Sequence, residues 1–294
     1  MAEKAKEKLS ATAKAALRKI RHLALDMDGT IYLGNSLFPF TLAFFERLER
    51  LGIGHSFLTN NPTKSIEDYR RKLAAMGISA SEEEIYTTPL AAIDYLRSEL
   101  PQVRRLFMLG TPSMREQFVQ AGFEDCADSP DDTPDALLVA FDTTLSYARL
   151  CRAAWWASQG LPYLATNPDR VCPTDQKTIL VDCGSLQSCL AEATGRRPDK
   201  VLGKPDPSML DGIRRRHQLE PGEIAMVGDR IYTDIAMGRR AGALSVLVLS
   251  GETSLETALK VRAEGGDPAK GLYPADLIVR DIEELGELLE ESRR

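Results

Sequence analysis

The chain has 294 residues, of which 43% are apolar and 27% charged, and its net charge is −6 at pH 7. This length supplies core material for one large α/β domain or two smaller ones. The acidic balance argues against a general nucleic-acid-binding surface, and no apolar run approaches the length of a membrane span. Composition therefore predicts a globular protein that binds neither nucleic acid nor membrane.

The first 20 residues, rich in Ala and Lys, precede the first apolar run of the chain. No continuous apolar segment follows their positive charges, which argues against a secretory signal, and Glu3 and Glu7 disfavour an organelle transit peptide. We expect residues 1–20 to form a solvated helical extension, whose role the sequence does not define.

The chain has an odd number of cysteines and no C-x-x-C pair, which argues against a disulfide framework and a zinc site. Reduced thiols favour a cytoplasmic location. The cysteines are Cys126, Cys151, Cys172, Cys183 and Cys189. All lie in the middle of the chain, which is a first sign that this region is a unit of its own.

Short β-rich runs alternate with helical segments along the whole chain, a pattern typical of a parallel sheet covered by helices. The predicted strands are residues 22–25, 53–58, 105–109, 136–141, 162–165, 224–227, 244–249 and 276–279. The predicted helices include residues 41–51, 65–76, 146–159 and 213–217, with an amphipathic terminal helix over 283–291. In such sheets ligands bind beyond the carboxyl ends of the strands, so the polar residues there are the candidates for a site.

Two strand ends in the first quarter of the chain carry polar groups. Asp26 and Asp28 follow the first apolar run, and an i, i+2 spacing throws both carboxylates to one side of a strand. Thr59 and Asn60 follow the second run. Taken singly, each stretch is equally well read as a polar turn.

Two further strand ends lie in the last third. Lys204 stands between Gly203 and Pro205, where a stiff turn holds it, although most isolated lysines are solvated. Asp229 follows another buried run, and Asp234 lies in the first turn of a predicted helix over 232–240, where it could instead serve the helix N-terminus.

The four stretches, in this order and each after a strand, resemble the motifs of the haloacid dehalogenase-like (HAD) phosphohydrolase superfamily. They read Asp26-x-Asp28-Gly-Thr, Thr59-Asn60, Lys204 and Gly228-Asp229-Arg230-x-x-Thr233-Asp234. The resemblance runs from about residue 22 to the C-terminus and implies a Rossmann-like, three-layer α/β core. Four ordered matches are specific, whereas any one would be weak.

A phosphate monoester is doubly negative, so a carboxylate nucleophile needs a cation and positive donors to approach it. The resemblance implies that Asp26 is this nucleophile and forms an aspartyl-phosphate, while Asp28 is the general acid and base. It also implies that Mg²⁺ binds the Asp26 side chain, the Asp28 backbone carbonyl and the Asp229 side chain. Asp234 would then anchor the metal-bound waters or the lysine rather than the metal itself.

The same resemblance implies that Lys204 neutralises charge on the phosphoryl group and on Asp26. Thr59 and the backbone at Asn60 would bind the phosphoryl oxygens. We therefore expect a Mg²⁺-dependent phosphatase acting on a small phosphorylated metabolite, such as a sugar phosphate or nucleotide monophosphate, with para-nitrophenyl phosphate as an artificial substrate.

The spacing of the motifs predicts where a second domain is inserted. Thr59 and Lys204 are 204 − 59 = 145 residues apart, far more than one crossover requires. We expect a core formed by residues 21–88 and 200–294 and an inserted α/β cap over 89–199. The flanks of the insert resemble the NagD-like, or para-nitrophenyl phosphatase-like, group with a C2-type cap, and such caps suggest a homodimer.

Inside the predicted cap, Thr166-Asn167-Pro168-Asp169 echoes Thr59-Asn60-Asn61-Pro62. One interpretation is that two strand ends share turn chemistry by chance, which Asn-Pro encourages. The resemblance instead implies the start of a substrate-specificity loop that continues to residue 175, with Asn167, Asp169, Arg170 and Cys172 as candidate contacts. A departure from the group's Pro-Gly-x-Gly-like turn, at residues 181–185, means that no relative's substrate preference transfers directly.

Two alternatives stay open. A phosphomutase would use the same aspartyl-phosphate, but mutases of this superfamily usually carry a cap between the first two motifs, where this chain has only 59 − 26 = 33 residues. A catalytically idle binding or regulatory protein would keep the fold. His22, His55 and His217 lie far apart in sequence and receive no catalytic role.

Overall fold

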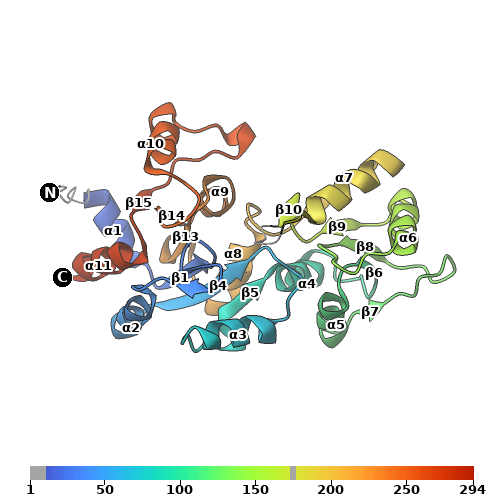
Figure 1. Ribbon diagram of the computed structural model, residues 1–294, viewed down its shortest axis with the longest axis horizontal. Coiled ribbons are helices and arrows are strands. Elements are labelled where there is room, and N and C mark those ends of the chain that lie inside the picture. Colours follow the sequence, from blue (N-terminus) through green and yellow to red (C-terminus); the bar gives the residue numbers. More distant parts are fainter. Residues whose placement is uncertain (1–10, 173–176) are drawn as a thin grey trace. The chain divides into compact units, whose positions relative to one another are not determined.

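A computed structural model describes residues 11–172 and 177–294, shown in Figure 1. The chain divides into two compact units, unit 1 (residues 1–56 and 214–294) and unit 2 (residues 57–213). The predicted cap, residues 89–199, falls inside unit 2, which also contains 57–88 and 200–213. Part of the predicted extension (1–10) and part of the predicted specificity loop (173–175) lie outside the described residues.

Unit 1 is built on parallel strands. Their order is β15-β14-β13-β1, and the start of β4 lies beside β1, where Gly54 N–H donates to the Arg21 carbonyl. The strands are β1 (His22–Asp26), β13 (Ile224–Gly228), β14 (Leu244–Val248), β15 (Leu277–Val279) and β4 (Gly54–Thr59), whose last three residues belong to unit 2. Almost every residue of β1 and β13 is buried, as expected for strands covered on both faces.

Helices cover the sheet of unit 1. They are α1 (Ala11–Lys19), α2 (Thr41–Leu51), α9 (Ala236–Arg240), α10 (Leu255–Glu264) and α11 (Ile282–Arg293), and a small hairpin of β2 (Tyr32–Leu33) and β3 (Ser36–Leu37) follows β1. Figure 1 shows α11 beside α1 and α2. Arg293 at the end of α11 donates to the Leu17 and Ile20 carbonyls, which ties the C-terminus to the segment before β1.

Unit 2 contains a second parallel sheet, in the order β12-β9-β8-β6-β7, with β7 and β12 at its edges. Alternate residues of its strands enter two cores: Leu106 and Met108 pack toward α4 and α5, whereas Phe107 and Leu109 pack toward α6 and α7. The strands are β6 (Arg105–Leu109), β7 (Glu124–Asp125), β8 (Ala136–Val139), β9 (Tyr163–Ala165) and β12 (Lys200–Val201), and the helices are α4 (Thr88–Glu99), α5 (Pro112–Gln120), α6 (Tyr147–Ser158) and α7 (Cys183–Thr194).

The rest of unit 2 begins with the end of β4, which pairs in parallel with β5 (Ile85–Thr87). It also contains α3 (Ile66–Ala75), α8 (Ser208–His217), which continues into unit 1, and a hairpin of β10 (Val171–Cys172) and β11 (Leu180–Val181). The predicted fold class is confirmed: helices flank parallel sheets in the Rossmann-like manner. None of the described helices is long and apolar enough to cross a membrane.

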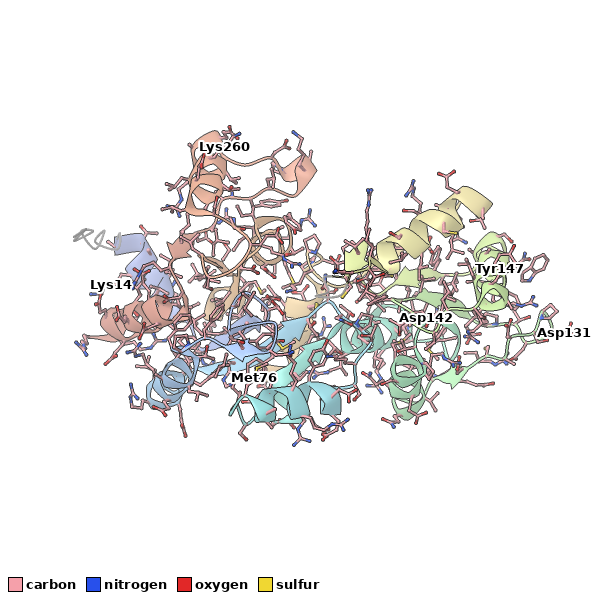
Figure 2. The ribbon with its side chains drawn as sticks, in the orientation of Figure 1. Lys14, Met76, Asp131, Asp142, Tyr147 and Lys260 are labelled. Carbon is pink, nitrogen blue, oxygen red and sulfur yellow. The ribbon has the colours of Figure 1, made fainter. Side chains whose placement is uncertain are left out.

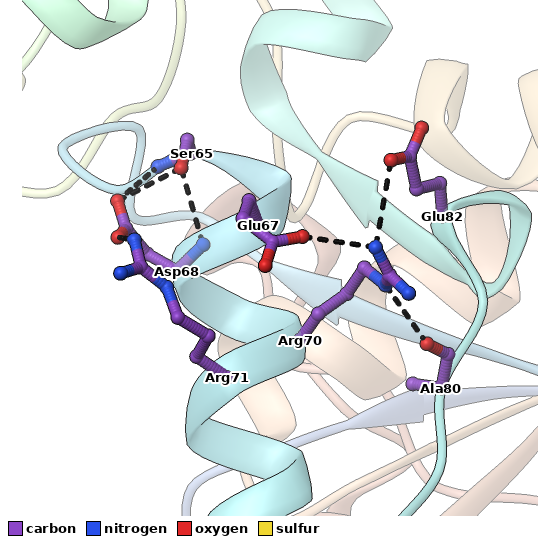
Figure 3. Close-up of polar contacts among 7 residues, drawn as sticks. All are labelled: Ser65, Glu67, Asp68, Arg70, Arg71, Ala80 and Glu82. Atoms are coloured by element: carbon purple, nitrogen blue, oxygen red, sulfur yellow. Dashed lines mark hydrogen bonds and ion pairs between the residues drawn. The ribbon is translucent and has the colours of Figure 1, made fainter.

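The start of α3 shows how sequence sets a helix end. Ser65 Oγ accepts the Asp68 N–H at 3.1 Å, and the Asp68 carboxylate accepts the Ser65 N–H at 3.0 Å (Figure 3). This capping box satisfies donors that the first turn leaves without a helical partner. Arg70 of the same helix donates to the Ala80 carbonyl, which holds the segment that leads to β5.

Trp155 and Trp156 are adjacent in α6, so their side chains point about 100° apart around the helix axis. Trp156 is buried in the core between α6 and the sheet, whereas Trp155 is half exposed. Tyr147, at the start of α6, projects from the helix with 83% of its surface exposed (Figure 2).

The three histidines, far apart in sequence, come together in unit 1. The rings of His22 and His217 lie 4.3 Å apart, and His22 Nε2 forms a 2.8 Å hydrogen bond with the Ser56 hydroxyl. Burial, followed by the charges of His217 and His55, lowers the pKa of His22 to about 3. The folded protein therefore keeps this ring neutral.

We expect unit 1 to lose stability in mild acid. Between pH 6.5 and 3 the unfolded chain binds a proton at His22 that the folded chain does not, so stability present above pH 6.5 falls by up to about 1.4 kcal/mol per pH unit below it. Urea unfolding at pH 7.5 and 5.5 measures this loss. His22→Leu should show a smaller loss over this interval, and an equal loss would contradict the assignment.

Candidate active site

Three carboxylates from unit 1 converge at the ends of neighbouring strands. Asp26 ends β1, Asp229 follows β13, and Asp234 lies in a π-helical turn, Ile231–Ile235, that precedes α9. One oxygen of each lies within 4.8 Å of the others. The pairing of β1 with β13 brings the first two together, because Leu25 is in register with Val227.

Backbone geometry holds this cluster tightly. The Asp229 carboxylate accepts the Glu252 N–H at 2.7 Å, and Asp234 accepts the Arg230 N–H at 3.1 Å. A Cβ on Gly29 would lie 2.5 Å from Asp229 Oδ2, and one on Gly251 would lie 2.1 Å from it. Only glycine leaves room there for the carboxylate, and Gly29 also adopts a left-handed φ of +84°.

The cluster has the chemistry of a site for a hard divalent cation. Asp229 and Asp234 are buried and Asp26 is partly buried, so mutual repulsion disfavours three charged groups at this spacing. A cation between them removes the repulsion, and carboxylate oxygens are the ligands that Mg²⁺ prefers. The residues therefore fit a Mg²⁺ ion.

Asp28 and Arg230 border the cluster. The side chain of Asp28 is exposed, on a turn closed by the Gly29 N–H and the Tyr32 carbonyl at 2.7 Å. Burial lowers the pKa of Arg230, but the Tyr232 hydroxyl and the carboxylates around it raise that pKa by more. Arg230 forms an ion pair with Glu252 at 2.9 Å and stays charged.

In unit 2, Thr59 and Asn60 stand at the end of β4. The Thr59 hydroxyl accepts the Asn61 N–H at 3.2 Å and lies 3.4 Å from the Tyr69 hydroxyl, whose pKa burial raises. Asn60 binds the backbone of Lys204, which is 5% exposed on the turn between β12 and α8. The predicted phosphate-binding segment and the predicted lysine are thus neighbours in unit 2.

The predicted specificity residues also lie beside this segment. Asp169 accepts a hydrogen bond from Asn60 Nδ2 at 2.8 Å, and Asn61 Nδ2 donates to the Cys172 sulfur at 3.6 Å. Arg170 is exposed, while its carbonyl accepts hydrogen bonds from Asp182 N–H at 2.9 Å and the Ser185 hydroxyl at 2.8 Å. Hydrogen bonds thus hold the backbone at Arg170, and the arginine side chain faces solvent.

Asn167 is fully buried, and both the nitrogen and the oxygen of its side-chain amide form hydrogen bonds. Its amide nitrogen donates at 3.0 Å both to Asp169 and to Asp182, which caps α7, and its oxygen accepts the Thr166 hydroxyl at 2.8 Å. Burial raises the pKa of Asp182 to about 6, although the hydrogen bonds from Asn167 and Cys183 lower it. Sequence reasoning missed Asp182, whose only signal was its position just before α7.

Comparison with known proteins shows the family. The profile of haloacid dehalogenase-like hydrolases matches residues 23–124, and a HAD-hydrolase-like profile matches residues 201–285. An acid sugar phosphatase of Staphylococcus aureus is 30% identical over 240 residues, which cover 82% of this chain and 90% of the relative. The chain belongs to the haloacid dehalogenase-like hydrolases.

Solved structures of HAD hydrolases agree along nearly the whole chain. A 4-nitrophenylphosphatase from Thermotoga maritima has a TM-score of 0.82 and 34% identity, covering 92% of this chain and 98% of its own. NagD from Escherichia coli has a TM-score of 0.78 at 26% identity, covering 90% and 98%. A glycerol phosphate phosphatase from Mycobacterium tuberculosis, in complex with magnesium, has a TM-score of 0.81 at 26%, covering 92% and 78%.

The expected resemblance to a HAD-type phosphatase of the NagD-like group, and with it the expectation of an enzyme, is confirmed. The roles of the individual site residues and the domain boundaries stay predictions.

We expect the glycines around Asp229 to be needed for metal binding. Gly251→Ala places a methyl group where Asp229 Oδ2 lies, so it should weaken binding of a divalent cation by about 10-fold or more. Titration with Mn²⁺ followed by electron paramagnetic resonance, with Mg²⁺ as competitor, measures this. The control is Gly222→Ala, whose Cβ would meet nothing within 4 Å; equal affinities in both variants would contradict the site.

Proposed function

We propose that this protein is a Mg²⁺-dependent phosphatase that hydrolyses a small phosphate monoester, such as a sugar or polyol phosphate, through an aspartyl-phosphate on Asp26. The single observation that carries the proposal is the convergence of Asp26, Asp229 and Asp234 at the strand ends of unit 1. The relatives support the substrate class, because their names include acid sugar phosphatase and glycerol phosphate phosphatase.

The roles follow from the chemistry of each group. Asp26 would attack phosphorus, forming a covalent intermediate that divides one difficult displacement into two. Asp28, exposed on a glycine turn two residues further on, would give a proton to the leaving alkoxide and later take one from the attacking water. Asp26 and Asp229, with the Asp28 carbonyl, would hold Mg²⁺, which supplies charge neutralisation that lets a carboxylate approach a dianion.

Unit 2 would supply the remaining groups. We propose that Thr59 and the backbone at Asn60 bind phosphoryl oxygens and that the Lys204 ammonium neutralises charge on the phosphoryl group and on Asp26. A buried lysine is a strong electrostatic stabiliser because little water screens it. The loop that carries Arg170 and Cys172 would contact the leaving group.

The first test is turnover of para-nitrophenyl phosphate with and without Mg²⁺. We expect activity that chelation abolishes, with inorganic phosphate as product, and a loss of more than about 10³-fold in kcat for Asp26→Asn, because a carboxamide is a far poorer nucleophile. The control is Asp128→Asn, an exposed carboxylate of unit 2 paired with Arg152.

Two outcomes would overturn this proposal. Absence of turnover in the wild-type protein across phosphorylated metabolites favours an idle binding protein. Transfer of the phosphoryl group to a second hydroxyl of a sugar, without release of phosphate, favours a phosphomutase.

The second test concerns substrate choice. Arg170→Ala should change the ranking of sugar, polyol and nucleoside phosphates by kcat/KM, and should alter para-nitrophenyl phosphate turnover less, since an exposed guanidinium whose backbone is held by a hydrogen bond can meet polar leaving groups. Arg197→Ala removes another exposed arginine of unit 2, outside the loop, and serves as the control. An unchanged ranking in Arg170→Ala would refute this role.

A further inference from the structure

We infer that the Asn60 side chain is a positioning group for Lys204, and that Asp169 holds the Asn60 amide in its working orientation. This assigns to both side chains a role different from direct contact with substrate. The inference rests on the proposed function for its catalytic meaning, but the geometry that carries it lies wholly within unit 2.

Asn60 grips both backbone polar groups of Lys204. Its Oδ1 accepts the Lys204 N–H at 2.8 Å, and its Nδ2 donates to the Lys204 carbonyl at 3.0 Å. The two partners also fix which end of the amide is which, because a donor faces the oxygen and acceptors face the nitrogen. One side chain thereby fixes the peptide groups on either side of the Lys204 Cα.

Asp169 fixes the amide from the other side. Its Oδ2 accepts from Asn60 Nδ2 at 2.8 Å and from Asn167 Nδ2 at 3.0 Å, so two amides share one carboxylate oxygen. With Lys204 O and Asp169 Oδ2 as its two acceptors, the Asn60 nitrogen has a partner for each of its hydrogens. A hydrogen bond to a charged acceptor is stronger than one between neutral groups.

The surroundings leave this arrangement little freedom. The Thr88 hydroxyl donates to the Asn60 carbonyl at 3.3 Å. A Cβ on Gly203 would lie 2.9 Å from Asn60 Oδ1 and 2.8 Å from the Thr166 carbonyl oxygen. Gly203 also has a left-handed φ of +74°. On the far side of the turn, Asp206 N–H donates to the Gly203 carbonyl at 2.7 Å, and Asp206 pairs with Lys200 at 2.6 Å.

These hydrogen bonds thus connect the start of the predicted specificity loop to the backbone of the predicted catalytic lysine through the side-chain amide of Asn60. Movement of Asp169 would release Asn60, and release of Asn60 would free the turn that aims Lys204. Since small misplacements of a catalytic group reduce rate strongly, we expect Asn60→Ala to lower kcat by about 10–100-fold and to raise KM less.

The test is a double-mutant cycle in kcat with Asn60→Ala and Lys204→Met. If Asn60 acts through Lys204, Asn60→Ala lowers kcat in the wild-type background but by less than about 2-fold in the Lys204→Met background. A role in general stability, or direct binding of substrate by the amide, would give the same fold loss in both backgrounds and overturn the inference.

A second pair of variants covers the case in which Asn60→Ala does not fold. Asn60→Asp keeps the acceptor for the Lys204 N–H but places two carboxylates side by side, so kcat should fall. If the loss acts through Lys204, Asn60→Asp should lower kcat by less than about 2-fold in the Lys204→Met background. An equal fold loss in both backgrounds would count against the inference. Asp125→Ala, which removes an Arg115-paired carboxylate of unit 2, should leave kcat unchanged.

Hydrogen exchange at the Lys204 amide separates this inference from the proposed function. In the substrate-free protein, exchange should accelerate by about 10-fold or more in Asn60→Ala and remain at the wild-type rate in Asp125→Ala. If the wild-type protein shows no turnover but exchange behaves this way, the proposed function fails and the positioning of Lys204 stands. If exchange is unchanged in an active enzyme, the inference fails alone.

Discussion

The repulsion among three carboxylates is the constraint that organises unit 1. Asp26, Asp229 and Asp234 bring their oxygens within 4.8 Å of one another at a largely buried place, where like charges repel one another and a bound cation would reduce that repulsion. Folding provides for it with glycines at positions 29 and 251, where any side chain would strike Asp229, and with backbone N–H groups that hold the carboxylates. The glycines and the backbone N–H groups thus keep the three carboxylates together at the ends of neighbouring strands.

In unit 2, hydrogen bonds with the Asn60 side chain hold the backbone of the buried residue Lys204. Lysine loses much rotamer freedom when it is fixed, and its backbone must be rigid before its side chain can be aimed. Here the turn that carries Lys204 is bounded by Gly203, by the Asp206–Lys200 pair and by the amide of Asn60. Rigid elements far apart in sequence thus meet at one peptide group, and the loop that begins at Asn167 is bonded to the same network.

Elements with a clear sequence pattern could be predicted closely, whereas the two-residue strands and the starts of α8 and α9 could not. Strand β6 and helix α2 have the predicted bounds, because an apolar run and an amphipathic period mark them clearly. Strands β10, β11 and β12 have two residues each and depend on pairing partners rather than on a pattern of their own. The motifs proposed Asp26, Asp229 and Lys204 as site residues, whose roles stay predictions, and gave Asn60 only a backbone role, since its side-chain partner stands 144 residues later. The clustering of His22, His55 and His217 could not be predicted either, because these residues lie far apart in sequence.

The insertion of unit 2 within unit 1 has a consequence for biosynthesis. Strand β1 is almost wholly buried, yet its partner β13 begins 224 − 22 = 202 residues later. At ribosomal speeds of about 5–20 residues per second, β1 waits roughly 10–40 s for that neighbour. Unit 2 is synthesised in the meantime, and Arg293, which donates to the Leu17 and Ile20 carbonyls, is synthesised later than β13. During this interval the apolar strand β1 lacks the neighbour that buries one of its edges in the folded sheet.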